Sequence, residues 1–374
     1  MRKTLCFVLT LLMVFAFIGC TQAPKDAGTA DSSSVAEVAQ TSDKKVLRIA
    51  GESWQITKLF LEDAAAAFEA DHPDVTVEVQ TYADPTVVSN YAIDWASGST
   101  PVDLVVIDGA QFVQQFVAKD LVYDFEKDLD FFSDYDVNKF VPSALEMSRI
   151  NGNLYVIPVI SEMTVVNINT KMFRDAGLVD AQGNVLVPTT WEEFHEYAKA
   201  LTIQDANGVV TQQGAVIQWN KDMHGTVLGV LQAMNGTIYG AEGISIDFDN
   251  EGFRSVLQIW KEGVADGSFS TETFSDTEAG RNGYKAGKVA MLIESSGRWV
   301  EAGNEFGFDN VSVCPLPGGK GTAGYVNGVF IPKCSEVSDL AIAFIKEQLL
   351  FQHVQTSTLN QYVKLPVITE YFDM

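Results

Sequence analysis

Positive charge, histidine and cysteine are all scarce in this chain of 374 residues. Only 25 lysines and arginines stand against 49 aspartates and glutamates, which gives a net charge of −24. Nucleic-acid phosphates and acidic lipid surfaces would repel such a chain, so we expect neither as a partner. The four histidines lie far apart, without the spacing of a metal site, at His72, His195, His224 and His353. We therefore predict no metal and no cofactor.

The four cysteines do not form a disulfide framework. Cys6 and Cys20 stand near the N-terminus, and Cys314 and Cys334 are the two in the body of the chain. Export from the cytoplasm would permit a disulfide between the last two. We favour the alternative, in which both are free thiols.

Catalytic motifs are missing as well. The sequence has no G-x-S-x-G elbow, and the GGKG at residues 318–321 lacks the spacing and the Ser/Thr of a phosphate-binding loop. A glycosidase needs two carboxylates facing each other across a bond, and the sequence cannot pair Asp108 with Glu162 among so many acidic residues. We expect a binding protein rather than an enzyme.

Long apolar runs are also missing, except at the N-terminus. Arg2 and Lys3 precede the apolar, uncharged residues 4–19. This run is shorter than the roughly 20 residues of a membrane-spanning helix, and no cluster of positive charge follows it. A secretion signal over residues 1–19 is therefore favoured over a single spanning helix.

The end of this run resembles the processing site of bacterial lipoproteins. In Ile18-Gly19-Cys20 a cysteine follows a small residue, and in that family the cysteine is lipidated and becomes the mature N-terminus. The residues that follow contain no aromatic and almost no large aliphatic side chain, so they cannot bury enough surface to fold. We predict a lipidated Cys20 with a flexible tether over residues 20–45. The protein would be anchored outside the cytoplasmic membrane, in a periplasm or at a cell surface.

Strand and helix patterns alternate in the first part of the body. Residues 46–51, 75–82 and 103–108 have strand character, and 57–71 and 87–97 have helical periodicity. This alternation is typical of an α/β fold with a parallel sheet, in which ligands bind beyond the carboxyl ends of strands. The roughly 330 residues beyond the tether predict two lobes rather than one.

Six sequence blocks, in order, resemble bacterial extracellular solute-binding proteins of the sugar class, which serve ABC importers and include maltose-binding protein. The blocks are HPDVTVEV, DLVVIDGAQFVQQFVAKDLVYDF, IPVISEMTVVNINTKMF, PTTWEEFHEYAKALT, GKVAMLIESSGRW and GYVNGVFIP, the last followed by a helix and LPV. The resemblance runs from residue 46 to the end. It implies an α/β, two-lobed, periplasmic-binding-protein-like fold (type II), with a sheet flanked by helices in each lobe and hinge strands that cross between them.

The same resemblance sets the expected lobes. Residues 46–159 and 314–358 would form the first lobe, and residues 160–313 and 359–374 the second. The chain would cross near 158–161, 304–314 and 359–365. Family members usually continue beyond the LPV segment with helices of the second lobe, so a C-terminally truncated second lobe is a further hypothesis.

Seven residues are candidates for ligand binding. Aromatic faces can cover the C–H face of a sugar ring, and carboxylates and amides can take its hydroxyls. The resemblance matches Asp108, Glu162 and Trp299 to ligand-binding positions. The full set is Trp54, Asp108, Glu162, Trp219, Trp299, Tyr325 and Asn327.

Several of these residues also have a purely structural alternative. Trp54 and Asp108 could cap the helix that follows each of them, Glu162 could form a hinge salt bridge, and Trp219 could be a core residue. The other three tryptophans, Trp95, Trp191 and Trp260, fall on apolar helical faces, so we assign them to the core.

The functional hypothesis is a monomer that captures a carbohydrate and delivers it to the permease of an ABC transporter. One alternative is a binding protein for another solute, such as a polyamine or a peptide; a polyamine would need carboxylates that converge with aromatic rings. Another alternative is a sensor that presents its ligand to a membrane kinase.

Replacing Cys20 with Ala tests the predicted anchor. Without the thiol the chain cannot be acylated, so we expect Cys20→Ala to be released from the membrane fraction or to stay unprocessed. Fractionation with radiolabelled fatty acid measures this, and Cys6→Ala is the matched control because Cys6 lies within the predicted signal. Normal lipid labelling of Cys20→Ala would contradict the prediction.

Overall fold

The computed structural model describes residues 44–84, 86–220, 223–240 and 245–372. The predicted signal peptide, Cys20 and nearly all of the predicted tether therefore lie outside the described residues. Within the described ranges, no helix combines the length and the apolar character needed to cross a bilayer.

The first part of the chain builds the half of the sheet that was expected from its alternating pattern. β1 (Lys45–Glu52) pairs in parallel with β2 (Val75–Tyr82) and β3 (Leu104–Ile107). The accompanying elements are α1 (Ser53–Lys58), α2 (Leu61–Asp71), α3 (Tyr91–Ala96), α4 (Gln114–Val117), α5 (Pro142–Met147), β4 (Arg149–Ile150) and β5 (Asn153–Leu154). The helix expected over 57–71 is interrupted at Phe60, which has a left-handed φ of 53°.

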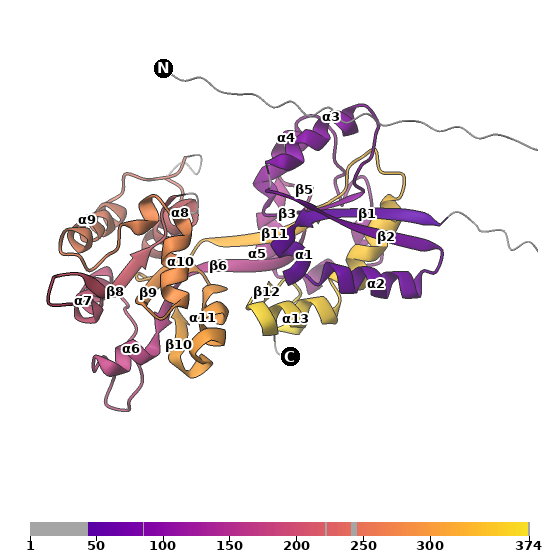
Figure 1. Cartoon of the computed structure of the whole chain (residues 1–374). Helices are drawn as coiled ribbons and strands as arrows, with labels where there is room; N and C mark the ends of the chain where they lie inside the picture. The colour runs from indigo at the N-terminus through magenta and orange to yellow at the C-terminus, as the bar shows by residue number, and fades with distance from the viewer. Residues whose placement is uncertain (1–43, 85, 221–222, 241–244, 373–374) are drawn as a thin grey trace, which may run out of the picture. The chain divides into compact units, whose positions relative to one another are not determined.

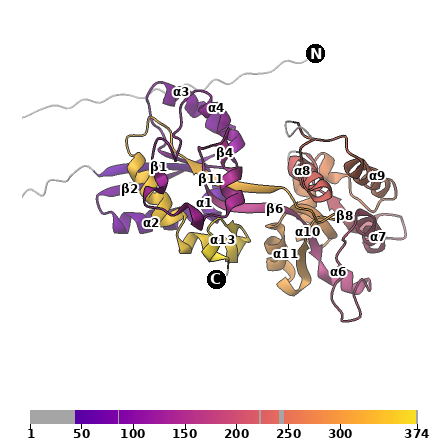
Figure 2. The same ribbon diagram turned by 180° about the vertical axis from the view of Figure 1, so that it is seen from behind.

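The long strand β6 (Ile157–Asn169) connects the two halves of the sheet. Its first part pairs with β11 (Gly324–Phe330), and its last part pairs with β9 (Val289–Ser295). The strand order is β2-β1-β3-β11-β6-β9-β8-β7, with β10 and β12 also on β6. Figures 1 and 2 show β6 as one continuous strand that runs from the first group of elements into the second.

The middle of the chain surrounds the second half of the sheet. Its strands are β7 (Ile203–Gln204), β8 (Val210–Ile217), β9 and β10 (Val311–Cys314), and β8 and β9 are parallel. Its helices are α6 (Thr170–Asp175), α7 (Trp191–Leu201), α8 (Met223–Asn235), α9 (Glu251–Ala265), α10 (Thr277–Lys285) and α11 (Arg298–Phe306).

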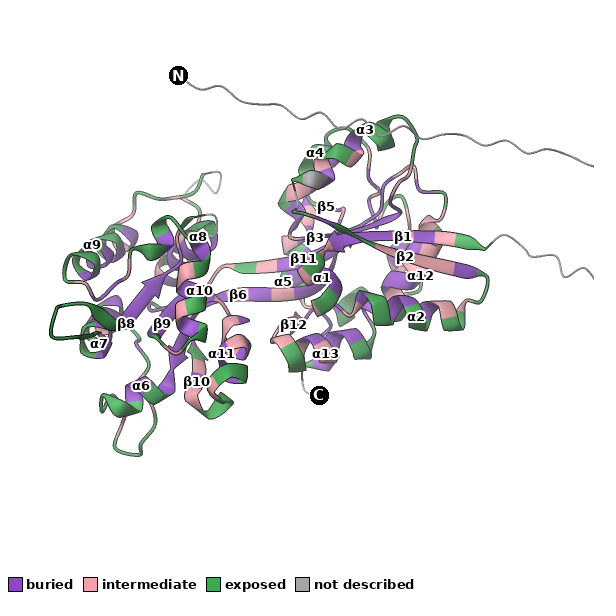
Figure 3. Ribbon diagram, viewed as in Figure 1, coloured by how far each residue is buried: buried purple, intermediate pink, exposed green. Residues whose placement is uncertain are grey.

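Separate hydrophobic clusters define two lobes (Figure 3). The first lobe buries side chains such as Leu47, Phe68, Leu104, Trp95 and Phe330. The second lobe buries side chains such as Ile168, Phe194, Trp191, Trp260 and Met291. Burial of these aliphatic and aromatic side chains is the main favourable term for each lobe. The assignment of Trp95, Trp191 and Trp260 to the core is confirmed.

The C-terminal residues pack differently from the sequence expectation. Residues 359–374 were expected in the second lobe, yet Val367, Ile368 and Tyr371 are buried in the first lobe's cluster. The reason is that β12 (Leu365–Pro366) pairs with the first part of β6, at Ser161 and Ile160. The helices α12 (Ser338–Phe344) and α13 (Gln352–Tyr362) precede it.

The return to the first lobe also comes later than expected. Cys314 was the expected first residue of that return, but Cys314 and Leu316 are buried in the second cluster. The strand that re-enters the first lobe is β11, where Val326 and Val329 belong to the first cluster. Cys314 and Cys334 are both free thiols, as favoured from the sequence.

Gln355 fastens the C-terminal segment to the crossing strand, and its replacement tests this packing. Its fully buried amide donates to the carbonyls of Val159 at 2.7 Å and Leu349 at 2.8 Å, and accepts from the Val367 N–H at 3.0 Å. Gln355→Leu leaves those buried groups unpaired, so we expect a loss of about 2–5 kcal/mol in the free energy of unfolding. Urea denaturation measures it. The exposed Gln352→Leu is the control, and equal losses in both variants would contradict the assignment.

Candidate functional site

A cleft with a volume of about 860 Å³ is lined by residues of both lobes and of the crossing strands. This volume lies in the range of small-molecule sites, about 300–1,000 Å³. The residues that line it are Glu52, Trp54, Lys58, Ala83, Asp84, Thr86, Asp108, Gly109, Gln111, Phe112, Met147, Glu162, Thr164, His224, Thr226, Arg281, Glu294, Ser295, Arg298, Gly324, Tyr325, Val326 and Lys364.

Three carboxylates of the first lobe gather on one wall. Glu52 ends β1, Asp84 follows β2 and Asp108 follows β3, so the carboxyl ends of three parallel strands deliver them to the same edge of the sheet. Burial raises the pKa of the Tyr82 phenol, and the negative charges of Glu52 and Asp108 raise it further. This wall therefore offers strong hydrogen-bond acceptors to a ligand.

Trp54 stands next to this wall on the first turn of α1. Its indole Nε1 donates to the Glu52 carboxylate at 2.5 Å, and the Lys364 ammonium lies 5.5 Å from the centre of its ring. The side chain is half-buried. These contacts fix the plane of the ring while part of it stays open to the cleft.

Glu162 lies in the middle of the crossing strand β6 and is almost fully buried. Lys364 forms an ion pair with its carboxylate, and the Ser295 hydroxyl donates to the same group. Burial by itself would raise the pKa of Glu162, but the positive charge and hydrogen bond of Lys364 and the hydrogen bond of Ser295 lower it to about 2. Glu162 is thus an ionised acceptor at neutral pH, and Lys364 balances its charge.

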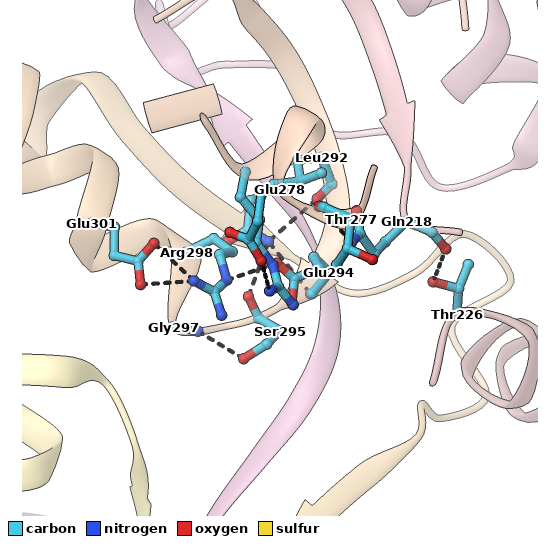
Figure 4. A network of polar contacts seen from close by, with 12 residues as sticks. Gln218, Thr226, Thr277, Glu278, Leu292, Glu294, Ser295, Gly297, Arg298 and Glu301 are labelled. Carbon is cyan, nitrogen blue, oxygen red and sulfur yellow. Dashed lines mark hydrogen bonds and ion pairs between the residues drawn. The ribbon is translucent and has the colours of Figure 1, made fainter. Parts of the chain in front are cut away.

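The second lobe contributes an alternating chain of ion pairs (Figure 4). The Glu294 carboxylate forms ion pairs with two arginines, with Arg298 Nε at 2.7 Å and Arg281 Nε at 2.9 Å. Arg298 also reaches Glu301 at 2.7 Å, and Glu301 lies 3.7 Å from the Lys58 ammonium of the first lobe. Burial lowers the pKa of Lys58, and the positive charge of Lys364 lowers it further. The cations of this wall therefore face carboxylates of the protein, and their charge is largely balanced.

Close contacts with residues of β6 and of the second lobe position Tyr325 on β11. Its hydroxyl lies 3.0 Å from the Thr164 hydroxyl, and its ring meets that of His224 edge to face at 6.0 Å. A Cβ on Gly225 would come within 1.5 Å of the Tyr325 hydroxyl, so a larger residue there would displace the Tyr325 side chain. Tyr325 presents one aromatic ring and one hydroxyl to the cleft.

Four of the seven candidate residues come together, and three do not. Trp54, Asp108, Glu162 and Tyr325 all line the cleft. Asn327 is only 1% exposed, behind the lining, where it accepts from Gln55 Nε2 at 3.1 Å.

The two remaining tryptophans pack within the second lobe. Trp219 meets Trp260 edge to face at 5.2 Å, and Trp299 lies 5.1 Å from the Phe308 ring. Each was a candidate for ligand binding, but neither lines the cleft, and each contacts an aromatic ring of its own lobe instead. We therefore do not include Trp219, Trp299 or Asn327 in the cleft.

Sequence reasoning missed the cations of the site, namely Lys58, Arg281, Arg298 and Lys364, and the aromatic Phe112. The ion-pair partners of Lys58 and Lys364 lie far away in sequence, so no local pattern pointed to these lysines. Arg281 and Arg298 have acidic partners three or four positions away, but such short-range pairs are common on helix surfaces and do not by themselves indicate a binding site. Among the described residues, no group of three or more His, Cys, Asp or Glu side chains is placed to hold a metal ion.

Removing the cation of the Glu162–Lys364 pair tests how much this ion pair contributes to the free energy of unfolding. Lys364→Met leaves a buried carboxylate without its cation, so we expect a loss of about 3–5 kcal/mol in the free energy of unfolding. The surface pair of Lys139 and Glu370, at 3.7 Å, supplies the control Lys139→Met, which should cost no more than about 1 kcal/mol. Urea denaturation at neutral pH compares the two, and similar losses would show that the buried pair has no special role.

The lowered pKa of Glu162 also predicts a pH dependence. A carboxyl whose pKa falls from 4.5 to about 2 on folding stabilises the folded state fully above pH 4.5, and this contribution is lost as the pH falls toward 2. We expect wild type to lose more stability over this range than Glu162→Gln, which cannot titrate at this position. Urea denaturation at stepped pH values measures the slopes, and parallel slopes would contradict the assignment.

Several known proteins are similar to this chain in sequence or in fold. A protein of Brucella abortus (strain 2308), provisionally named as binding protein BAB2_0491, is 23% identical over 317 residues, covering 82% of this chain and 72% of its own length. The GacH receptor of Streptomyces glaucescens, whose structures include acarbose complexes, superimposes with a TM-score of 0.70 at 19% identity, over 88% of this chain and 82% of that chain. The ABC substrate-binding protein Lmo0181 of Listeria monocytogenes, in complex with cycloalternan, gives a TM-score of 0.68 at 19% identity. The match covers 89% of this chain and 84% of that chain.

These structures confirm the two-lobed α/β fold expected from the sequence. The family model of bacterial extracellular solute-binding proteins matches residues 63–373, which include all the residues that line the cleft except Glu52, Trp54 and Lys58. The resemblance proposed from the six sequence blocks is thereby confirmed, and so is the expectation of a binding protein rather than an enzyme. The chain belongs to the bacterial extracellular solute-binding proteins.

Proposed function

We propose that this protein captures a carbohydrate in its cleft and delivers it to the permease of an ABC transporter. The observation that carries this proposal is the composition of the cleft, in which the rings of Trp54, Phe112 and Tyr325 stand among acceptors such as Asp108 and Glu162. Aromatic faces suit the C–H face of a pyranose, and carboxylates are strong acceptors for its hydroxyls.

The relatives support the same solute class. The structures of GacH and Lmo0181 contain acarbose and cycloalternan, which are both carbohydrates, and Lmo0181 is described as an ABC substrate-binding protein.

We propose that this chain acts as a monomer. We also propose that it is held outside the cytoplasmic membrane by a lipid on Cys20, on the sequence evidence of Ile18-Gly19-Cys20 and the polar segment that follows.

A polyamine is the second candidate solute, because Glu52, Asp84 and Asp108 converge on one wall close to Trp54. Amines would be drawn to the carboxylates and to the ring. The other walls favour a neutral ligand instead, since their carboxylates are already paired with Lys58, Arg298 and Lys364, which an amine would have to displace. We therefore rank carbohydrate first.

A melting-temperature panel separates these solutes. Maltose, cellobiose, mannobiose, xylobiose, spermidine and a tripeptide are each added in excess, and a ligand that binds only the folded state at 100 times its Kd adds about 2.7 kcal/mol. We expect a sugar to raise the melting temperature. A rise with spermidine alone would replace the carbohydrate proposal with the polyamine one.

Uptake in cells separates transport from sensing. Deleting the gene should abolish accumulation of the radiolabelled sugar if the protein delivers its ligand to a permease. Normal accumulation, with loss of a transcriptional response to the sugar, would instead support presentation to a membrane kinase.

Replacing Trp54 with Ala tests the aromatic platform. We expect binding to weaken by about 1–3 kcal/mol, with the stacking of bases on aromatic side chains as the guide to magnitude. Titration calorimetry with the sugar found in the panel measures this. Trp299→Ala is the matched control, because Trp299 packs on Phe308 outside the cleft lining and its loss should leave the affinity unchanged. If only Trp299→Ala weakens binding, the platform has been assigned to the wrong tryptophan.

A further inference from the structure

A second groove, with a volume of about 740 Å³, adjoins the cleft on the first lobe. It shares Glu52, Trp54, Lys58 and Ala83 with the cleft. The residues that line the groove alone are Ser53, Thr57, Thr81, Tyr82 and Tyr362. Because the two hollows have four residues in common, a ligand in the cleft can continue into the groove without leaving the protein surface.

Trp54 stands at the boundary between the two hollows. Its hydrogen bond to Glu52 sets the orientation of the indole at the boundary. A ring held in this way lines both spaces, and little side-chain entropy is lost when a ligand packs on it.

Tyr362, the last residue of α13, supplies the groove with a second aromatic side chain. Its half-buried ring lies 5.6 Å from the Lys58 ammonium and 5.9 Å from the Phe60 ring, so its position is set by contacts on more than one side. Ser53, Thr57 and Thr81 add hydroxyls around it. The groove thus combines ordered aromatic rings with hydroxyl groups that both donate and accept, as the cleft does.

The charges around the groove favour a neutral ligand. Lys364 lies near the Trp54 ring and Lys58 lies near the Tyr362 ring, so each aromatic side chain already has an ammonium group beside it. A ligand amine would find the position beside each ring already taken by an ammonium group of the protein. A sugar unit does not compete for these positions, and its hydroxyls could accept hydrogen bonds from the Lys58 ammonium, which lines the groove.

We propose that the groove is a further carbohydrate subsite, and that the ligand is an oligosaccharide that fills the cleft with one end and continues past Trp54 onto Tyr362. This inference rests on the proposed function, because it concerns the length of the same ligand. In this proposal Tyr362 and Ser53 select ligands by the length of the oligosaccharide, and the cleft recognises the first sugar units.

Titration calorimetry with oligosaccharides of increasing length tests the proposal. The probes are the α-1,4-glucan series from maltose to maltohexaose and the corresponding β-1,4-glucan, mannan and xylan series. In wild type, we expect the affinity to rise at least fivefold between the shortest ligand that binds and the ligand two units longer. In Tyr362→Ala, that rise should disappear, while the shortest ligand keeps its affinity to within twofold.

A second variant fills the groove instead of removing a contact. Ser53 is exposed and lines the groove but not the cleft, so Ser53→Trp should block the longer ligands and spare the shortest one. Thr211→Trp is the matched control, since Thr211 is exposed on β8 and lines neither hollow. Melting temperatures close to that of wild type show that each variant is folded.

The outcomes separate this inference from the function on which it rests. If a sugar binds but its affinity does not depend on length, or if Tyr362→Ala and Ser53→Trp weaken short and long ligands equally, the subsite is refuted and carbohydrate binding stands. If no member of any series binds, both proposals are refuted.

Discussion

The buried ion pair between Glu162 and Lys364 is the interaction on which the arrangement around the cleft depends. Glu162 belongs to the strand that runs through both lobes, and Lys364 directly precedes the short strand β12 that pairs with it. Burying either charge alone would be costly, so each side chain requires the other to be in place. The pair therefore ties the C-terminal segment to the crossing strand at the floor of the cleft. The Ser295 hydroxyl, at the end of β9 in the second lobe, donates a hydrogen bond to the same Glu162 carboxylate.

This pair also explains how a strongly acidic chain can hold cations in its binding cleft. Lys364, Arg298 and Arg281 are each matched by a carboxylate of the protein within hydrogen-bonding distance. Their donors are thereby held in fixed directions while their net charge is cancelled. A neutral ligand with many hydroxyls can use such donors and acceptors, whereas a charged ligand would have to displace a protein partner first. Fixed polar groups are also the ones that lose the least entropy on binding.

The sequence was sufficient for those parts of the fold that follow from local patterns. The alternation of strand and helix predicted the first half of the sheet, and the position of Asp108 at the end of an apolar strand predicted its place at the cleft. Trp95, Trp191 and Trp260 were assigned to the core because their helices have an apolar face on which each of them lies. Each of these predictions needed only the period of one element and its direction in the sheet.

The expectations that the structure does not support were those that depended on which elements pack against one another. Residues 359–374 pack in the first lobe because Gln355 and β12 hold them against β6, and neither contact has a local signature. Trp219 and Trp299 each follow a strand much as Asp108 does, but their rings pack against Trp260 and Phe308 and do not line the cleft. Whether an aromatic residue at the end of a strand faces a ligand or a neighbour is decided by packing between elements, which a single sequence does not encode in any local pattern.

The position of Trp54 has a consequence for how ligand binding is coupled to the two lobes. A ligand shifts the balance between two arrangements of the lobes only by the difference in its affinity for them. Trp54 and the carboxylates beside it come from the first lobe, so contacts with them alone are the same in every arrangement and supply no such difference. Groups of the crossing strands and the second lobe, such as Tyr325, Thr226 and Arg298, are the ones whose distance from a ligand on Trp54 changes when the lobes move. Units of an oligosaccharide on Tyr362 would add affinity within the first lobe, while the units in the cleft would set the preference for one arrangement. Affinity and coupling would then be carried by different parts of one ligand.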